Sequence, residues 1–115
     1  MTIRFLPDVA VLYMLAFARI GAILMLLPGV GETAVTARIR LAFALLVTLV
    51  LHPLTASLYP MGLSTKPALL AVLLGGEIAI GLFIGMASRL VLAAAQVAGT
   101  TIANQLGLGF AMTVD

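Results

Sequence analysis

The chain has 115 residues, of which 63% are hydrophobic and 9% are charged, and its mean hydropathy is +1.28. Soluble globular domains carry about 25% charged residues, so this composition excludes an ordinary soluble domain and predicts a membrane protein or a part of a membrane assembly. The absence of cysteine excludes disulfides and thiol chemistry, and the net charge of +2 comes from scattered residues, which argues against nucleic-acid binding.

The first apolar run, residues 9–27, predicts a membrane-length helix that is retained in the mature chain. Signal peptides have apolar regions of about 7–15 residues followed by a cleavage site of small residues, and this run is longer and lacks such a site. It measures about 28 Å as a helix, close to the ~30 Å hydrocarbon layer. Pro7 and Asp8 favour a helix start, and Pro28 with Gly29 favours a stop.

Arg19 lies inside this helix, about 12 Å from its C-terminal end. An arginine in the middle of a span costs about 2.5–3.5 kcal/mol even on lenient insertion scales. One interpretation is an anchor that extends toward the membrane surface. We favour the other, in which Arg19 faces protein or water and pairs with a carbonyl or a carboxylate.

A second helix is predicted after the loop at residues 28–33, and its uncharged part, residues 41–51, measures about 16 Å, or half of a bilayer. Thr33 or Thr36 can cap its start, and the expected end is His52, before Pro53. Two alternatives stay open for this segment. It either continues through a kink at Pro53 or is a short helix buried in protein.

Residues 53–67 hold three prolines and form the predicted loop before a third helix that begins near Pro67. Residues 68–88 contain one charge, Glu77, and suffice for a third span. A helix that continued to Ala103 would exceed about 50 Å. We therefore expect a kink, a break or a protrusion beyond the bilayer, near a glycine or Arg89.

One face of this third helix differs from the rest of its surface. At about 100° per residue, its small and polar residues fall within a third of the circumference. Gly81 and Gly85 form a pair of small residues four positions apart, which lets a second helix backbone come close. We predict that this face contacts protein and not lipid. It comprises Glu77, Gly81, Gly85, Ser88, Arg89, Ala95, Gln96, Gly99 and Ala103.

Glu77 carries the most distinctive chemistry in the sequence. A lone carboxylate in hydrocarbon is protonated or paired, and proton-coupled transporters use such groups as relays. We favour the simpler interpretation, an acid bonded to an arginine or to a neighbouring subunit. Arg89 lies about 18 Å from Glu77 along one helix, so Arg19 or a partner chain is the better candidate.

Catalytic motifs are absent from the sequence, which has one histidine and no cysteine. No second acid lies close to Glu77, so neither a nucleophilic triad nor a paired-carboxylate site can form. The glycine-rich residues 105–110 lack the Lys-Ser/Thr pair of a phosphate loop. We expect no enzymatic activity, no cofactor and no metal site.

Four stretches occur in a familiar order: FARIG before Pro28, then ARIRLAFAL, GEIAIGLFIG and AGTTIANQLGLGFAMTVD. In this order the chain resembles the FliR family of the flagellar type III export apparatus and its virulence-secretion counterpart, the SctT proteins. The last stretch is the most specific, because family members typically carry a G-x-x-x-x-x-Q-x-G-L-x-x-A run leading to Asp-Pro. It occupies Gly99, Gln105, Gly107, Leu108, Ala111 and Asp115.

The resemblance implies an all-α fold of about three to four membrane-type helices packed as bent hairpins. Residues 1–115 would be a single N-terminal helical part, with the C-terminal half of a family member absent. Such a subunit would sit in the bacterial inner membrane at the flagellar basal body. It would assemble with FliP-like, FliQ-like and FlhB-like subunits into a gate for unfolded exported proteins. The residues expected in subunit packing or inter-helix polar contacts are Arg19, Glu77, Gly81, Gly85, Arg89, Gln96, Gly99, Gln105 and Gly107.

Two alternatives remain. One is the injectisome counterpart of the same gate. The other is a small proton-coupled transporter that uses Glu77. Drug exporters of about this length hold their essential glutamate in the first helix, whereas here the first helix carries an arginine.

Overall fold

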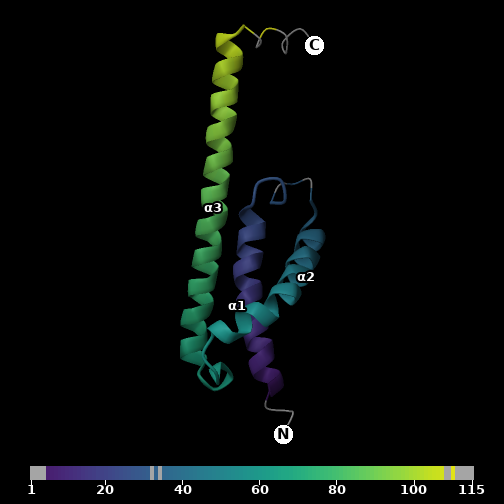
Figure 1. The fold of residues 1–115 in the computed structure, drawn as a ribbon, viewed down its shortest axis with the longest axis vertical. Helices are drawn as coiled ribbons and strands as arrows, with labels where there is room; N and C mark the ends of the chain where they lie inside the picture. The colour runs from purple at the N-terminus through teal and green to yellow at the C-terminus, as the bar shows by residue number, and fades with distance from the viewer. Residues whose placement is uncertain (1–4, 32, 34, 108–109, 111–115) are drawn as a thin grey trace.

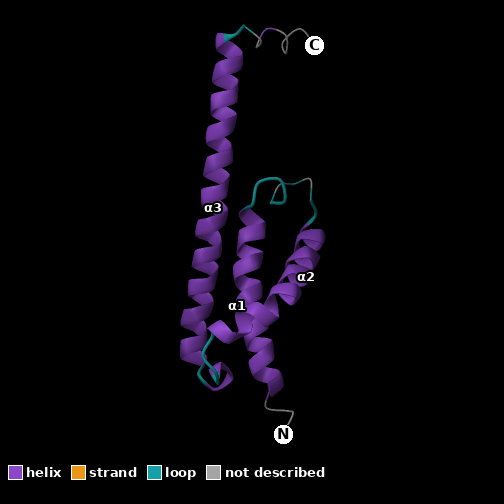
Figure 2. Ribbon diagram, viewed as in Figure 1, coloured by secondary structure: helices purple, strands orange, loops and turns teal. Residues whose placement is uncertain are grey.

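The computed structural model describes residues 5–31, 33, 35–107 and 110. Its long elements are the helices α1 (Phe5–Leu26), α2 (Ala37–Thr55) and α3 (Pro67–Gln105), with the short 3₁₀ turns η2 (Ala56–Leu58) and η3 (Leu63–Thr65) before α3 (Figure 1). Within the described ranges there is no strand (Figure 2), so the predicted all-α class is confirmed. Leu108, Ala111 and Asp115 of the C-terminal motif lie outside these ranges.

Helix α1 forms where the apolar run predicts it. Pro7 lies in the first turn, where its missing N–H has no helical acceptor, and Asp8 in the same turn complements the positive end of the helix. The chain leaves the helix through Pro28 and Gly29. Gly29 has a φ of 88°, which glycine adopts without strain.

Helix α2 continues past Pro53 to Thr55. Thr36 occupies the N-cap position and has an extended backbone, while its side chain makes no capping hydrogen bond. Of the two alternatives left open, the structure has the one in which the helix continues through Pro53, so it does not end at His52. Pro53 removes one backbone donor from the last turn. There the Thr55 hydroxyl donates to the carbonyl of Leu51 at 3.2 Å.

Helix α3 is continuous over 39 residues, or about 58 Å. Pro67 takes the first helical position, as expected. Of the three outcomes expected for a helix of this length, a kink, a break or a protrusion, the structure has no break, since helical structure runs without interruption through the glycines and Arg89. The distal half of α3 instead extends past the other helices (Figure 1), and the longest dimension of the chain reaches 71 Å.

Helix α1 lies between the other two long helices and packs against both, whereas α2 and α3 make no close backbone approach to each other. Tyr13 of α1 donates its hydroxyl to the Leu45 carbonyl of α2 at 2.7 Å, and its ring packs on His52 with centroids 5.8 Å apart. The core is small. Its buried apolar residues are Leu15, Ala16, Leu24, Ala44 and Leu63.

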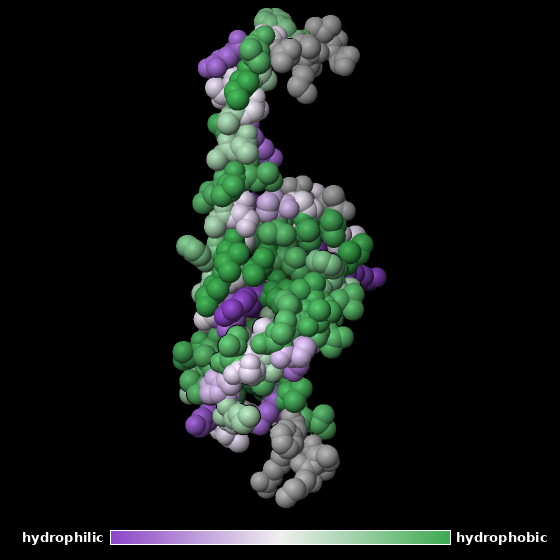
Figure 3. All heavy atoms as spheres, in the orientation of Figure 1, coloured by the Kyte–Doolittle hydropathy of each residue, from purple (hydrophilic) through white to green (hydrophobic). Residues whose placement is uncertain are grey.

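The face of the molecule seen in Figure 3 is mostly apolar, as the predominance of green shows. Exposed large side chains include Leu46, Val50 and Leu54 on α2, and Val72 and Phe83 on α3. All three helices are long and apolar enough to cross a membrane. The surface of this chain therefore suits lipid or other apolar helices better than water.

Candidate functional site

An ion pair between Arg19 of α1 and Glu77 of α3 lies within the apolar interface of these helices. Arg19 Nη2 donates to Glu77 Oε1 at 2.9 Å, and Arg19 Nε faces Glu77 Oε2. Both carboxylate oxygens thus contact the planar guanidinium, the geometry that arginine offers and lysine does not. The pair joins two helices through residues that are 58 positions apart in sequence.

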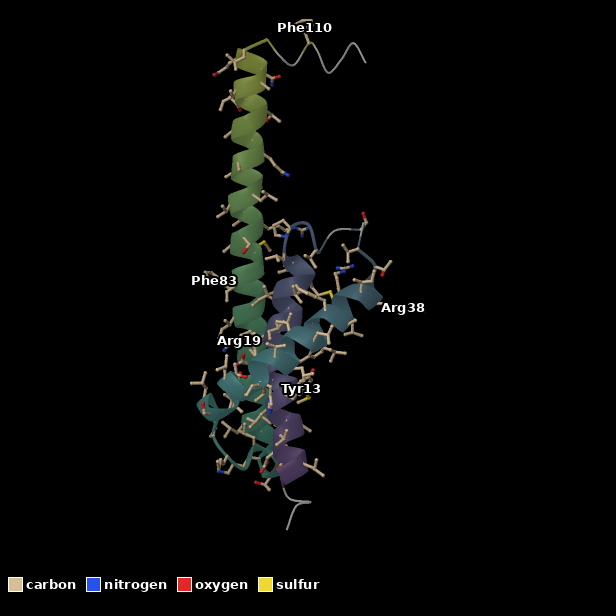
Figure 4. The ribbon with its side chains drawn as sticks, turned by 45° about the vertical axis from the view of Figure 1, so that its right-hand side comes forward. Tyr13, Arg19, Arg38, Phe83 and Phe110 are labelled. Carbon is tan, nitrogen blue, oxygen red and sulfur yellow. The ribbon has the colours of Figure 1, made fainter. Side chains whose placement is uncertain are left out.

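The two partners differ in their exposure. Glu77 is 6% exposed, and the side chain of Arg19 is 40% exposed. Figure 4 labels Arg19 where α1 passes α3, and Figure 3 shows a hydrophilic patch within the apolar face at a similar height. Pairing removes the need to bury a lone carboxylate, which would be costly in this apolar interface.

Gly81 and Gly85 allow the close approach of α1 and α3 beside this ion pair. A Cβ atom added at Gly81 would lie 2.6 Å from the backbone oxygen of Arg19. One added at Gly85 would lie 2.7 Å from the Cβ atom of Leu26. Both separations are too short for carbon contacts, so any larger residue would push the helices apart. The small-residue pair of α3 therefore meets α1 of the same chain.

Tyr59 lies near enough to this ion pair for both of its charges to act on the tyrosine hydroxyl, although no sequence pattern singles it out. It follows η2 directly and is half-buried. Burial raises the pKa of Tyr59 to about 12, with hydrogen bonding to Glu77 and the charge of Glu77 acting in the same direction and Arg19 acting against them. Tyr59 lies in a proline-rich loop, where no periodicity in the sequence predicts the direction of a side chain. Its position near Glu77 therefore could not be predicted from the sequence.

The other predicted site residues lie away from the cluster. Arg89, Gln96, Gly99 and Gln105 are exposed on the part of α3 toward and beyond the end of α1. A Cβ atom added at Gly99 would meet nothing within 4 Å. Gly107 follows the helix with a φ of 71°. The contacts of these residues with other subunits stay a prediction.

The described residues include no group of three or more His, Cys, Asp or Glu side chains that could hold a metal ion. The cluster of Arg19, Glu77 and Tyr59 instead comprises one cation, one anion and one hydroxyl, drawn from three parts of the chain. Chemically, such an arrangement can bind helices to each other through directed hydrogen bonds.

Comparison with known proteins identifies the family of the chain. Residues 10–115 match the family described as bacterial export proteins, family 1. The flagellar biosynthetic protein FliR of Caulobacter vibrioides is 42% identical over 101 residues, which make up 88% of this chain and 40% of that protein. The chain therefore spans about 40% of the length of this relative. No solved structure matches the chain. On this match over nearly its whole length, the chain belongs to the bacterial export proteins, family 1.

Proposed function

We propose that the chain acts as the N-terminal helical part of a core subunit of the flagellar type III protein export gate, without enzymatic activity. The family match and a relative that is named for flagellar biosynthesis support this role. Three helices capable of crossing a membrane support a location in the bacterial inner membrane, at the flagellar basal body. In this proposal the chain assembles with FliP-like and FliQ-like subunits, next to a FlhB-like subunit, around a path for unfolded proteins.

The distal half of α3 is the structural observation that supports assembly with other subunits. From Leu90 to Gln105 it forms about 24 Å of helix whose side chains are almost all exposed. Leu90, Val91 and Val97 are each more than 60% exposed. A helix this apolar is normally buried, and the other described elements do not cover it. Helices of partner subunits would supply the missing cover.

The transporter alternative receives less support from the geometry of Glu77. A proton relay must exchange its proton with water or substrate, whereas this carboxylate is buried and both its oxygens face Arg19. The ion pair suits a structural tie between helices. The injectisome counterpart remains an alternative outcome of the assembly experiment.

Co-purification tests the proposal. The tagged chain is expressed with FliP and FliQ homologues of the same bacterium, solubilised in mild detergent and recovered on its tag. We expect both partners in the eluate. With injectisome homologues in their place, we expect weaker recovery, and a reversed preference would assign the chain to the injectisome. If neither set of partners is recovered, the gate assignment is wrong.

Two glycine variants test whether the distal half of α3 forms the interface with the partners. Gly99 and Gly75 both lie on α3, and a Cβ atom added at either position would meet nothing within 4 Å. Gly99→Leu adds bulk to the distal half, and Gly75→Leu adds the same bulk near the start of the helix. We expect Gly99→Leu to lower partner recovery at least severalfold and Gly75→Leu to leave it unchanged. Equal recovery with both variants would remove the distal half of α3 from the interface.

A further inference from the structure

We propose that the chain binds an anionic phospholipid at the level where α1 ends, with Arg89 holding the phosphate and the groove between Pro28 and α3 holding part of an acyl chain. Arg38 and Arg40, at the start of α2, add positive charge at the same level. This inference goes beyond the proposed function, because it concerns lipid. Its tests use no partner subunit, so its failure would leave the gate assignment untouched.

The charged residues of α3 enclose a length that matches a bilayer. Lys66 occupies the N-cap position, and Arg89 lies about 34 Å further along the helix. The one charged residue between them is Glu77, which is paired with Arg19. A hydrocarbon layer is ~30 Å thick. When this part of α3 crosses the layer, Arg89 therefore lies at the level of the phosphate groups.

The end of α1 and the start of α2 lie at the same level as Arg89. Arg89 is one helical turn beyond Gly85, where an added Cβ atom would lie 2.7 Å from the Cβ atom of Leu26 in the last turn of α1. Arg40 Nη1 donates at 3.5 Å to a backbone carbonyl of the loop that follows α1. Arg38 lies beside it at the start of α2 (Figure 4). Three arginines thus gather at one end of the span.

Positive charge predominates at this end. Within the described part of the chain, Arg38, Arg40 and Arg89 form no ion pair, and Arg38 and Arg89 are exposed. The segment between α1 and α2 contains one acid, Glu32, which lies outside the described residues. Three arginines outnumber this single acid, so the formal charge stays positive. Arginine and lysine at a membrane surface attract anionic lipid.

The groove beside Arg89 has the amphipathic lining that suits a phospholipid. It has a volume of about 360 Å³, and its polar residues are Arg89 and Gln96. The planar guanidinium matches a phosphate group, and apolar side chains favour an acyl chain over water. The groove reaches no further along α3 than Gln96, which leaves Gly99 free for partner subunits. Its apolar lining comprises Pro28, Met86, Leu90, Leu92 and Ala93.

A second groove, at the opposite end of the span, carries the opposite charge. It has a volume of about 310 Å³ and lies between the start of α1 and the connection between α2 and α3, residues 56–66. The charged residue of its lining is Asp8, which accepts a hydrogen bond from Ser64 Oγ at 2.6 Å. An acid here disfavours a phosphate group. Lys66, in the same connection, therefore provides a control cation.

Lipid binding to the purified chain tests the proposal. The delipidated chain in a neutral detergent is titrated with dioleoyl phosphatidylglycerol or dioleoyl phosphatidylcholine, and native mass spectrometry measures each dissociation constant. We expect phosphatidylglycerol to bind at least tenfold more tightly. Equal affinities would overturn the proposal. Excess glycerol 3-phosphate should not displace the lipid, and displacement would show that the site takes a free phosphate instead.

Arg89→Gln and Lys66→Gln are matched variants, since each removes one exposed cation from one end of the span. We expect Arg89→Gln to weaken phosphatidylglycerol binding at least fivefold and to leave phosphatidylcholine binding unchanged. Lys66→Gln should change neither, and Arg89→Lys should retain most of the preference. Circular dichroism verifies that the helices persist. Equal phosphatidylglycerol affinities in the two glutamine variants would overturn the assignment of Arg89.

Ala93→Phe tests the groove separately from the charge. Ala93 is an exposed part of the apolar lining, so a phenyl ring there would occupy the groove while Arg89 stays in place. We expect severalfold weaker binding of phosphatidylglycerol. Ala71→Phe, at an exposed position near the start of α3, is the control and should bind as the wild type does. Unchanged affinity in Ala93→Phe would overturn the placement of an acyl chain in this groove.

Discussion

At the scale of single residues, the Arg19–Glu77 pair is the feature that a substitution should affect most. Glu77→Ala leaves a guanidinium without its anion in an apolar interface. Breaking a buried pair costs about 3–5 kcal/mol, and we expect the lower end because Arg19 is 40% exposed. Thermal unfolding in detergent would measure the loss of stability.

The matched control for Glu77→Ala removes both charges. Arg19→Met combined with Glu77→Leu leaves no uncompensated ion, and we expect it to recover most of the lost stability. A single variant as stable as the double variant would mean that the pair contributes little.

Tyr59 should make stability depend on pH in the alkaline range. Its pKa is about 12 in the folded chain and 10 without perturbation, so the folded state holds the proton more tightly. The resulting stabilisation is fully present below pH 10 and is lost as the pH rises through about 12. Because Tyr59 is only half-buried, this stabilisation is small. We expect the stability advantage of wild type over Tyr59→Phe to shrink between these pH values in chemical unfolding. An advantage independent of pH would contradict this assignment.

At the scale of elements, the contact between α1 and α3 should be sensitive to a single methyl group. In Gly81→Ala the new Cβ atom would meet the backbone oxygen of Arg19 at 2.6 Å, which no side-chain rotation relieves. We expect a loss of about 1–3 kcal/mol. Gly75→Ala adds the same methyl group to open space in the same helix. It should stabilise the chain by about 0.5–1 kcal/mol. Equal effects at both positions in thermal unfolding would mean that the helices separate without cost.

The close packing of Gly85 also limits which variants can report on partner subunits. A leucine at this position would collide with Leu26 of the same chain, so a loss of assembly in Gly85→Leu could arise from misfolding. Gly99 has no such neighbour, which makes it the informative position for assembly.

At the scale of the whole molecule, sequence patterns predicted the features that depend on local chemistry. The apolar run that ends before Pro28 predicted α1, and Pro67 predicted the start of α3. The end of α2 could not be predicted, because packing against α1 competes with the helix-breaking tendency of Pro53. The position of Tyr59 depends on how the connection folds back, which no local periodicity encodes. The sequence left two candidates for pairing with Glu77, Arg19 and a partner chain. The structure selects Arg19, because α1 and α3 pack together where these two residues lie.

The excess length of α3 leads to a prediction about its surroundings. Helix α1 has 22 residues, or about 33 Å, which matches a hydrocarbon layer of ~30 Å. Helix α3 is about 25 Å longer, so its distal half cannot share that layer while it packs along α1. Because the chain has no cysteine, single cysteines can report on water access without background.

We expect Thr100→Cys in membranes to react rapidly with a water-soluble maleimide, and Ile80→Cys, at the height of α1, to react slowly. Co-expression of FliP and FliQ homologues should then protect Thr100→Cys severalfold. Met61→Cys serves as the exposed control, because Met61 lies in the connection between α2 and α3, at the end of the molecule away from the distal half of α3. The partners should not change its labelling. Labelling of Thr100→Cys as slow as that of Ile80→Cys, without partners, would place the distal half of α3 in lipid and contradict this arrangement.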